Sequence, residues 1–155
     1  MKKLMVLTGL AFLLVSNVHA IDASFSAEKA FNLTLKLFKP ITITKLQDLA
    51  FPDTTLTGAA YDVSVATADS GAATFNVQGG KNRAIATSIV EPNITMSAPG
   101  VTGTLTVDSW AIAAPAHFDA SGDANGIKVG AVAHILAASE DGNYAGTATL
   151  RVAYQ

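Results

Sequence analysis

The sequence predicts an all-β protein, and three of its features support that fold class. Short segments of alternating apolar and polar residues recur along the chain, separated by clusters of Gly, Pro, Asn and Asp, which is typical of a β-sandwich. No segment has the apolar spacing that three turns of an amphipathic helix would need. Only 14% of the residues are charged, and the 155 residues suffice for one domain with a substantial core.

The first twenty residues have the pattern of a secretory signal peptide. Two lysines precede an apolar run at residues 4–15, and Val18 and Ala20 then occupy the small-residue positions of a cleavage site. The alternative is a transmembrane anchor, but the run is shorter than the roughly 20 apolar residues that a span requires. We therefore expect export, a mature chain that starts at Ile21, and no transmembrane segment in the mature chain.

The composition narrows the classes of partner. Loss of the two lysines in the first segment lowers the formal charge from −2 to −4, and the remaining chain has no cluster of basic residues. We therefore expect no binding to nucleic acid. The chain has no cysteine, so an exported domain of this size must be stabilised by packing and strand pairing instead of disulfides.

The predicted strands follow one another closely along the mature chain. Alternation through residues 31–37 ends before Pro40, which cannot donate to a ladder and so marks a strand boundary or an edge. A second alternating run starts at Ile41. Residues 119–126 are expected to form a polar loop. Further strands are expected at residues 60–66, 73–78, 84–90, 94–96, 101–110 and 127–136.

The clearest strand pattern lies in the last fourteen residues, 142–155. It follows a turn signal at Asp141-Gly142 and places alternate side chains on one face. This pattern predicts a half-buried β-strand. A strand in this place forms the edge of a sheet, and such an edge needs a partner. The residues on its apolar face are Ala148, Leu150, Val152 and Tyr154.

The residues that could carry chemistry do not form a recognisable site. His117 and His134 lack the paired spacing of a metal site, and we expect His134 to be a satisfied or edge histidine in an apolar strand. Asp119, Asp123 and Asn125 offer oxygen ligands, but their spacing does not match a calcium loop, so a solvated loop of turn formers is favoured. No catalytic nucleophile motif or phosphate-binding glycine loop is present. We expect neither an enzyme nor a cofactor.

The two ends of the mature chain resemble those of pilins assembled by the chaperone–usher pathway. In that family the last strand alternates, its penultimate residue is a tyrosine, and a glycine lies fourteen residues from the end; Tyr154 and Gly142 match these positions. The run F-N-L-T-L-K-L-F-K-P-I-T-I resembles the donor strand of such subunits. The chain also resembles bacterial secreted β proteins catalogued as a domain of unknown function, through P-I-T-I and the ending G-N-Y-x-G-x-x-x-L-x-V-x-Y. It departs from many pilins in having no cysteine pair.

The resemblance implies an incomplete immunoglobulin-like β-sandwich, completed by an N-terminal donor strand from a neighbouring subunit. It divides the mature chain into a donor extension at residues 21–38 and a sandwich domain at residues 39–155. The side chains that the extension inserts would be Phe31, Leu33, Leu35 and Leu37, with Phe25 and Ala27 as outer ones. The acceptor groove, which is also the chaperone-binding strand, would involve Gly142, Ala148, Leu150, Val152 and Tyr154.

The function that the resemblance implies is that of a structural subunit of a bacterial surface fimbria, or pilus, which polymerises head to tail by donor-strand exchange and supports adhesion or biofilm formation. Its partners would be other copies of the chain, a periplasmic chaperone and an outer-membrane usher. It would pass through the periplasm to the surface filament. The alternative is a monomeric secreted binding module, for example for carbohydrate, with Trp110, Phe118 and Tyr61 as candidate exposed aromatics. Whether the N-terminal strand is exchanged or completes its own domain stays open.

Overall fold

The computed structural model describes residues 27–155, which contain eight β-strands and no helix. Every strand pairing is antiparallel. The predicted all-β fold class is confirmed, and each predicted strand region beyond Pro40 contains a strand. The strands are β1 (Thr42–Gln47), β2 (Tyr61–Val65), β3 (Ala73–Gln78), β4 (Ile85–Ile89), β5 (Ile94–Ser97), β6 (Thr104–Ala113), β7 (Asp123–Ile135) and β8 (Leu150–Tyr154).

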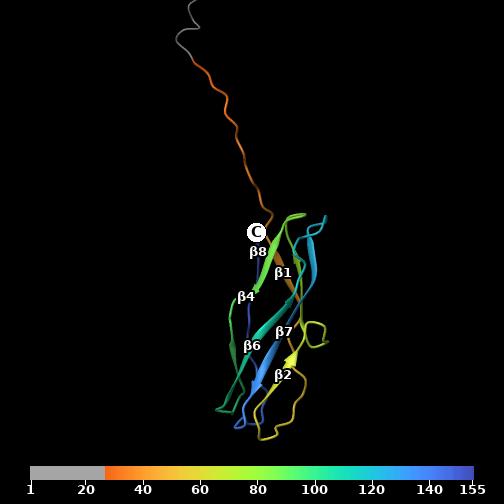
Figure 1. Ribbon diagram of the computed structural model, residues 1–155, viewed down its shortest axis with the longest axis vertical. Helices are drawn as coiled ribbons and strands as arrows, with labels where there is room; N and C mark the ends of the chain where they lie inside the picture. The colour runs from red at the N-terminus through yellow and green to blue at the C-terminus, as the bar shows by residue number, and fades with distance from the viewer. Residues whose placement is uncertain (1–26) are drawn as a thin grey trace, which may run out of the picture. The chain divides into compact units, whose positions relative to one another are not determined.

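Six of these strands form one sheet around β7. The long strand β7 pairs with β6 along one edge, and with β3 and then β2 along the other. β1 continues the sheet beyond β3, and β5 continues it beyond β6. β1 and β5 are therefore edge strands, and Figure 1 shows β6, β7 and β2 as neighbours within the sheet.

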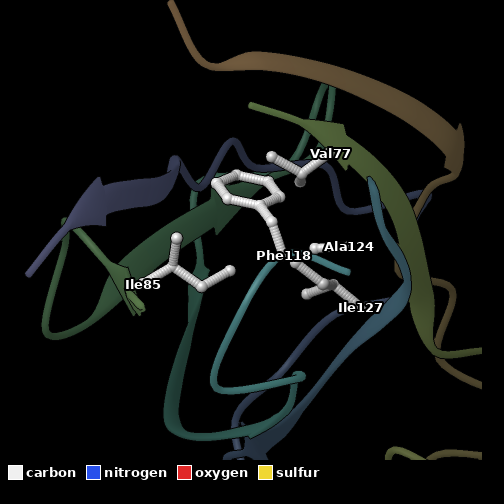
Figure 2. Close-up of a cluster of buried hydrophobic side chains, with 5 residues drawn as sticks. All are labelled: Val77, Ile85, Phe118, Ala124 and Ile127. Atoms are coloured by element: carbon white, nitrogen blue, oxygen red, sulfur yellow. The ribbon is translucent and has the colours of Figure 1, made fainter. Parts of the chain in front are cut away.

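The remaining strands, β4 and β8, form a separate two-stranded sheet. A buried apolar cluster joins the two sheets, because Ile85 lies on β4 whereas Val77 and Ile127 lie on β3 and β7. Figure 2 shows the ring of Phe118 directed into the space between Ile85 and Val77. The fully buried members of this cluster dominate the core. The cluster consists of Val77, Ile85, Phe118, Ala124 and Ile127.

A bulge in β6 determines which of its side chains face the core. The register with β7 shifts by one residue between Asp108 and Ala111, and Ser109 in this interval has a φ of 52°. A bulge of one residue exchanges the two faces of the strand that follows it. Trp110 therefore packs on the same cluster as Val107. The strand also ends at Ala113, three residues later than the sequence predicts.

The predicted polar loop at residues 119–126 is wrong in its second half, because β7 begins at Asp123. Here β7 carries one extra residue relative to β3, Gly126 has a φ of 73°, and its N–H donates to Oδ1 of Asn76 at 3.1 Å. Glycine tolerates this left-handed conformation, so a glycine that resembled a turn signal lies in a bulge. The carboxylate of Asp119 closes the remaining turn by accepting N–H bonds from residues 121–123.

All three of those hydrogen bonds end on one oxygen of Asp119, Oδ1. The N–H of Asp123, and then those of Ser121 and Gly122, hold the pKa of the Asp119 carboxyl below its usual value. Among residues 27–155 no group of three acidic or histidine side chains is arranged to hold a metal ion. The loop is a hydrogen-bonded turn.

The predicted C-terminal strand at residues 142–155 is also too long. Regular pairing covers only Leu150–Tyr154, whereas Ala145 forms an isolated bridge with Ser97 on β5, with N···O distances of 2.9 and 3.0 Å. The segment therefore leaves one sheet at Ala145 and joins the other at β8. Alternation in the sequence reports the two faces of a strand but not its partner, which is why this change of sheet was not predicted.

Residues 37–155 form one compact unit. Residues 27–36, described by themselves, form neither helix nor strand, and their side chains are exposed. The predicted signal peptide and Phe25 lie outside the described residues. In the part of the chain that is described, no helix has the length and apolar character needed to cross a membrane.

Candidate functional site

Two adjoining grooves run beside the C-terminal segment. Groove 1 has a volume of about 430 Å³ and is lined by residues from β1 to Phe51 and by the segment that leads into β8. Groove 2 has a volume of about 470 Å³ and is lined by β2, its preceding loop and residues 139–144. Phe51, Met96 and Tyr144 line both. We call the two together the C-terminal groove.

One side of groove 1 is formed by apolar side chains. Val107 lines the groove and belongs to a second buried cluster with Ala131 and Ala133, and the larger side chains around this cluster are only partly buried. Large apolar side chains left uncovered on this scale usually mark a site of interaction. The side chains that border groove 1 in this way are Leu49, Phe51, Ile94, Met96 and Trp110.

One edge of β8 is open. The pairing with β4 is fixed by hydrogen bonds from Val90 N–H to Thr149 C=O at 2.9 Å and from Gln155 N–H to Ala84 C=O at 3.1 Å. In an antiparallel pair, both backbone groups of a hydrogen-bonded residue point to the partner, and those of the next residue point away. The backbone groups on the far edge, which no strand of residues 27–155 pairs, belong to Leu150, Val152 and Tyr154.

The side chains of these residues are also incompletely covered. Leu150, Val152 and Tyr154 form the core-facing side of β8, and all three pack against the first cluster while remaining partly exposed. A strand that faces a core normally buries such side chains completely. β8 therefore has both an open backbone edge and a partly exposed inner face.

The side chain of Tyr154 fixes the end of β8 to the start of the compact unit. Its hydroxyl accepts the N–H of Gly80 at 2.7 Å and donates to the carbonyl oxygen of Lys39. Its ring packs against Phe38 and Phe118, with centroid distances of 5.3 and 5.8 Å. Aromatic pairs at these distances add to the energy of burial. Tyr154 thus holds the residues from which the N-terminal segment departs.

The other end of β8 is held by Glu91. Its two carboxylate oxygens accept the N–H of Thr149 at 2.8 Å and the hydroxyl of Thr149 at 2.9 Å. These bonds, the backbone one first, hold the pKa of the Glu91 carboxyl below its usual value. The contact lies where the C-terminal segment passes between the two sheets.

The predicted acceptor residues are distributed along the same groove and strand. Ala148 and Leu150 line groove 1, and Gly142 lines groove 2. Val152 and Tyr154 pack on the first cluster beyond the grooves. Ala148 lies outside the regular part of β8 and is exposed. Their role as an acceptor stays a prediction.

The predicted donor residues that the structure describes are all exposed. Ala27 is exposed, and the four larger apolar side chains have exposed fractions of 75 to 83%. Each of the four alternates with a residue of small or polar character, as the sequence shows. Their insertion into a partner stays a prediction. The four are Phe31, Leu33, Leu35 and Leu37.

Of the three aromatic residues proposed for the alternative binding module, two line a groove and one is buried. Trp110 lines groove 1, and its indole N–H donates to the carbonyl oxygen of Pro92 at 3.1 Å. Tyr61 lines groove 2. Phe118 is only 1% exposed, because it fills the space between the two sheets. Phe118 was therefore wrong as a candidate ligand-binding aromatic.

Sequence reasoning missed one polar cluster. His134 Nδ1 lies 2.7 Å from Oδ1 of Asp62, and His134 Nε2 lies 2.9 Å from Oδ1 of Asp108. His134 is a satisfied histidine, as predicted, but it is isolated only in the sequence. In the sequence, Asp108 lies 26 positions and Asp62 lies 72 positions from His134. Only the register of β2, β7 and β6 brings the three residues together. The only sequence signal for this cluster was the alternation of apolar and polar residues, which places each of the three side chains on the outer face of its strand.

Comparison with known proteins gives a family without an assigned activity. A family model described as "Domain of unknown function (DUF4402)" matches residues 52–154. The match spans β2 to β8, and it includes the G-N-Y-x-G-x-x-x-L-x-V-x-Y ending by which the sequence resembles a domain of unknown function. No curated protein and no solved structure matches the chain.

Proposed function

Because the chain belongs to the family described as "Domain of unknown function (DUF4402)", we propose a function from the geometry of its C-terminal groove. The chain is a structural subunit of a surface filament, and its subunits join by strand addition. Residues 27–37 of one subunit insert along the open edge of β8 in the next. The observation that carries this proposal is the unpaired backbone edge at Leu150, Val152 and Tyr154, whose first residue also lines groove 1.

The open edge supplies the main-chain part of the interaction. An exposed strand edge is a template for another extended chain, because its N–H and C=O groups lie in the plane of the sheet. Every second residue of β8 presents both groups to the incoming strand. Main-chain bonds of this kind give affinity, and pockets for alternate side chains give specificity.

The donor segment supplies the apolar part. Phe31, Leu33, Leu35 and Leu37 would lie on one face once this segment is extended as a strand, and their exposed fractions of at least 75% are unusual for side chains of this size. Burial of each contributes about 1.5–3 kcal/mol, or roughly 6–12 kcal/mol together before ordering costs. That gain is comparable to the stability of a small domain.

The two surfaces that meet in the contact determine the kind of assembly. The donor segment and the acceptor groove are different surfaces of the same chain, so the contact is heterologous. Contacts of this type that do not close into a ring repeat as an open filament. We therefore propose head-to-tail polymerisation, with adhesion or biofilm formation as the role of the filament.

The same proposal accounts for the fold and the partners before assembly. The domain is an incomplete immunoglobulin-like sandwich, and the inserted strand takes the missing position beside β8. An open strand edge beside partly exposed apolar side chains is an aggregation hazard. A periplasmic chaperone therefore covers it after export, and an outer-membrane usher exchanges the chaperone for the next subunit.

Negative-stain microscopy of the mature chain tests this proposal. The chain from residue 21 onward should form filaments, whereas a variant that lacks residues 21–37 should remain dispersed. A third variant carries residues 21–37 behind a flexible linker at the C-terminus of the shortened chain. It should be a monomer with a higher Tm than the shortened chain, because its groove is filled in cis.

Two outcomes would overturn the proposal. Filaments that persist after removal of residues 21–37 would show that another contact drives assembly. A monodisperse monomer of the mature chain, with no rise in Tm on C-terminal fusion, would show that the groove needs no added strand. The second outcome favours the monomeric binding module, for which Trp110 in groove 1 is the residue to test by ligand titration.

A further inference from the structure

Three strands of the larger sheet are linked on its outer face by one histidine. His134 lies on β7, directly opposite Asp62 on β2, and Asp108 lies on the other neighbouring strand, β6. Figure 1 shows these three strands as neighbours. Both ring nitrogens of His134 are within 2.9 Å of a carboxylate oxygen. The link therefore spans the full width of β2, β7 and β6.

The geometry specifies the protonation state of the imidazole. A neutral imidazole has one N–H and can donate to only one of the two carboxylates, and its other nitrogen would then face a carboxylate oxygen with two lone pairs opposed. Both contacts are favourable only when the ring carries two N–H groups and a positive charge. Distances of 2.7 and 2.9 Å are those of charge-assisted hydrogen bonds.

Few other charged side chains lie on these three strands. Asp62 is the only residue of β2 that carries a charge at neutral pH, and Asp108 is the only one of β6. On β7 itself the other charged residues are Asp123 and Lys128. The hydrogen bond to Asp108, and then that to Asp62, raises the pKa of His134, and the same contact with His134 lowers the pKa of Asp108. Ser109 also donates to Asp108, at 2.8 Å.

The cluster lies behind one wall of groove 2. Tyr61 and Val63, on either side of Asp62, line that groove, and so do Ala133 and Ile135, on either side of His134. Alternate residues of a strand face opposite sides, so the cluster and the groove occupy the two faces of the same strand pair. β2 pairs with β7 and with no other strand of residues 27–155. Its backbone is therefore paired through that single ladder, and the cluster adds a side-chain link to the same neighbour.

We propose that Asp62, His134 and Asp108 form a pH-sensitive staple that holds β2, a wall of groove 2, on the sheet while the imidazole is charged. The staple is complete below the ordinary histidine pKa and is lost as pH rises through the raised pKa of His134. The staple itself is independent of strand addition. Its consequence for an incoming strand, a looser groove at alkaline pH, rests on the proposed function.

Amide hydrogen exchange of β2 in the full chain tests the staple. Protection factors, corrected for the pH dependence of intrinsic exchange, are measured from about pH 5 to about pH 9, a range that spans the histidine titration. Protection of those amides of Tyr61–Val65 that face β7 should fall as pH rises, by at most about tenfold for each unit by which stapling raises the pKa of His134. Protection of β3 should stay constant, because β3 has no contact with the cluster.

Matched variants identify the histidine that is responsible. His134→Gln should lower β2 protection at acidic pH and abolish the pH dependence, whereas His117→Gln should leave both as in the unchanged chain. Asp62→Asn removes one of the two charges and should move the transition to lower pH. These amides are followed in the same way in monomers and in filaments, so the result does not depend on how the chain assembles.

Two results would overturn the staple. One is constant β2 protection across the pH range in the unchanged chain, and the other is an undiminished pH dependence in His134→Gln. If His134→Gln does not fold, the ¹⁵N shifts of the His134 ring in the unchanged chain decide instead. The staple requires both nitrogens to carry hydrogen until the pH exceeds the ordinary histidine pKa, and a ring that is singly protonated at neutral pH would exclude it.

Discussion

The hydroxyl of Tyr154 donates a hydrogen bond to the carbonyl oxygen of Lys39, the residue that precedes Pro40. This contact connects β8 to the point at which the chain enters the compact unit. The ring of Tyr154 packs on Phe38 at the same place, and the guanidinium of Arg83 lies 4.9 Å from the Phe38 ring centroid. The segment proposed as a donor is therefore anchored at the end of the strand proposed as an acceptor.

Tyr154→Phe should destabilise the chain by about 1–2 kcal/mol, since it removes two hydrogen bonds and leaves the Gly80 N–H without its acceptor. Tyr144→Phe is the matched control, because that hydroxyl makes one exposed hydrogen bond, to the carbonyl oxygen of Glu140. Urea unfolding of both variants measures the difference. Equal midpoints for the two variants would show that the Tyr154 hydroxyl has no special role.

Gly79→Ala should destabilise the chain by about 1–3 kcal/mol through overpacking. A Cβ at this position would lie 2.5 Å from the ring of Phe118 and 2.8 Å from Oη of Tyr154. Phe118 is 1% exposed and packs within the first buried cluster. Gly103→Ala is the control, because its nearest neighbour, Oη of Tyr144, is 4.0 Å away. Thermal unfolding of Gly79→Ala at the unchanged Tm would contradict this packing.

The contact between Glu91 and Thr149 should make stability depend on pH in the acid range. Because the folded-state pKa of Glu91 is lowered, the contribution is fully present above the ordinary glutamate pKa and is lost as pH falls through the lowered value. Glu91→Gln should reduce Tm near neutral pH and flatten the acid part of the Tm–pH curve. Glu140→Gln serves as control. A Glu91→Gln curve parallel to that of the unchanged chain would refute the assignment.

Leu35→Asp should weaken assembly, because it places a charge where the proposal buries an apolar side chain. Lost burial alone corresponds to about 1.5–3 kcal/mol, which raises the concentration needed for assembly at least about tenfold. Thr34→Asp carries the same charge on the opposite face of the strand and should assemble nearly normally. Sedimentation velocity measures both variants. Equal inhibition by the two would contradict the proposed strand register.

The strand positions could be predicted because alternation and turn residues are local properties of the sequence. The bulges could not be predicted in the same way. Gly126 reads as the end of a loop, yet its positive φ places it inside β7, and Ser109 has no sequence signal for the bulge that directs Trp110 into groove 1. Both bulges depend on the register with a neighbouring strand, which is a property of the fold.

For the candidate site as well, the sequence indicates the local strand face but not the distant segments that lie beside it. The alternating face of β8 identified Leu150, Val152 and Tyr154, since a period of two is visible in the sequence. The far wall of the groove, with Leu49, Phe51 and Met96, comes from segments about fifty to a hundred residues away. The link between Asp62 and His134 likewise requires that β2 pairs with β7 in one particular register. Long-range pairings of this kind leave no local pattern.

The open edge of β8 is tested most directly by amide hydrogen exchange in the chain that lacks residues 21–37, with and without a peptide of residues 27–37. Binding is followed by the fluorescence of Trp110, the only tryptophan. Without peptide, the amides of Leu150, Val152 and Tyr154 should exchange rapidly while those of Arg151 and Ala153, which face β4, are protected. With peptide, all five should be protected. Rapid exchange of the first three at saturating peptide, or their protection before it is added, would contradict strand addition at this edge.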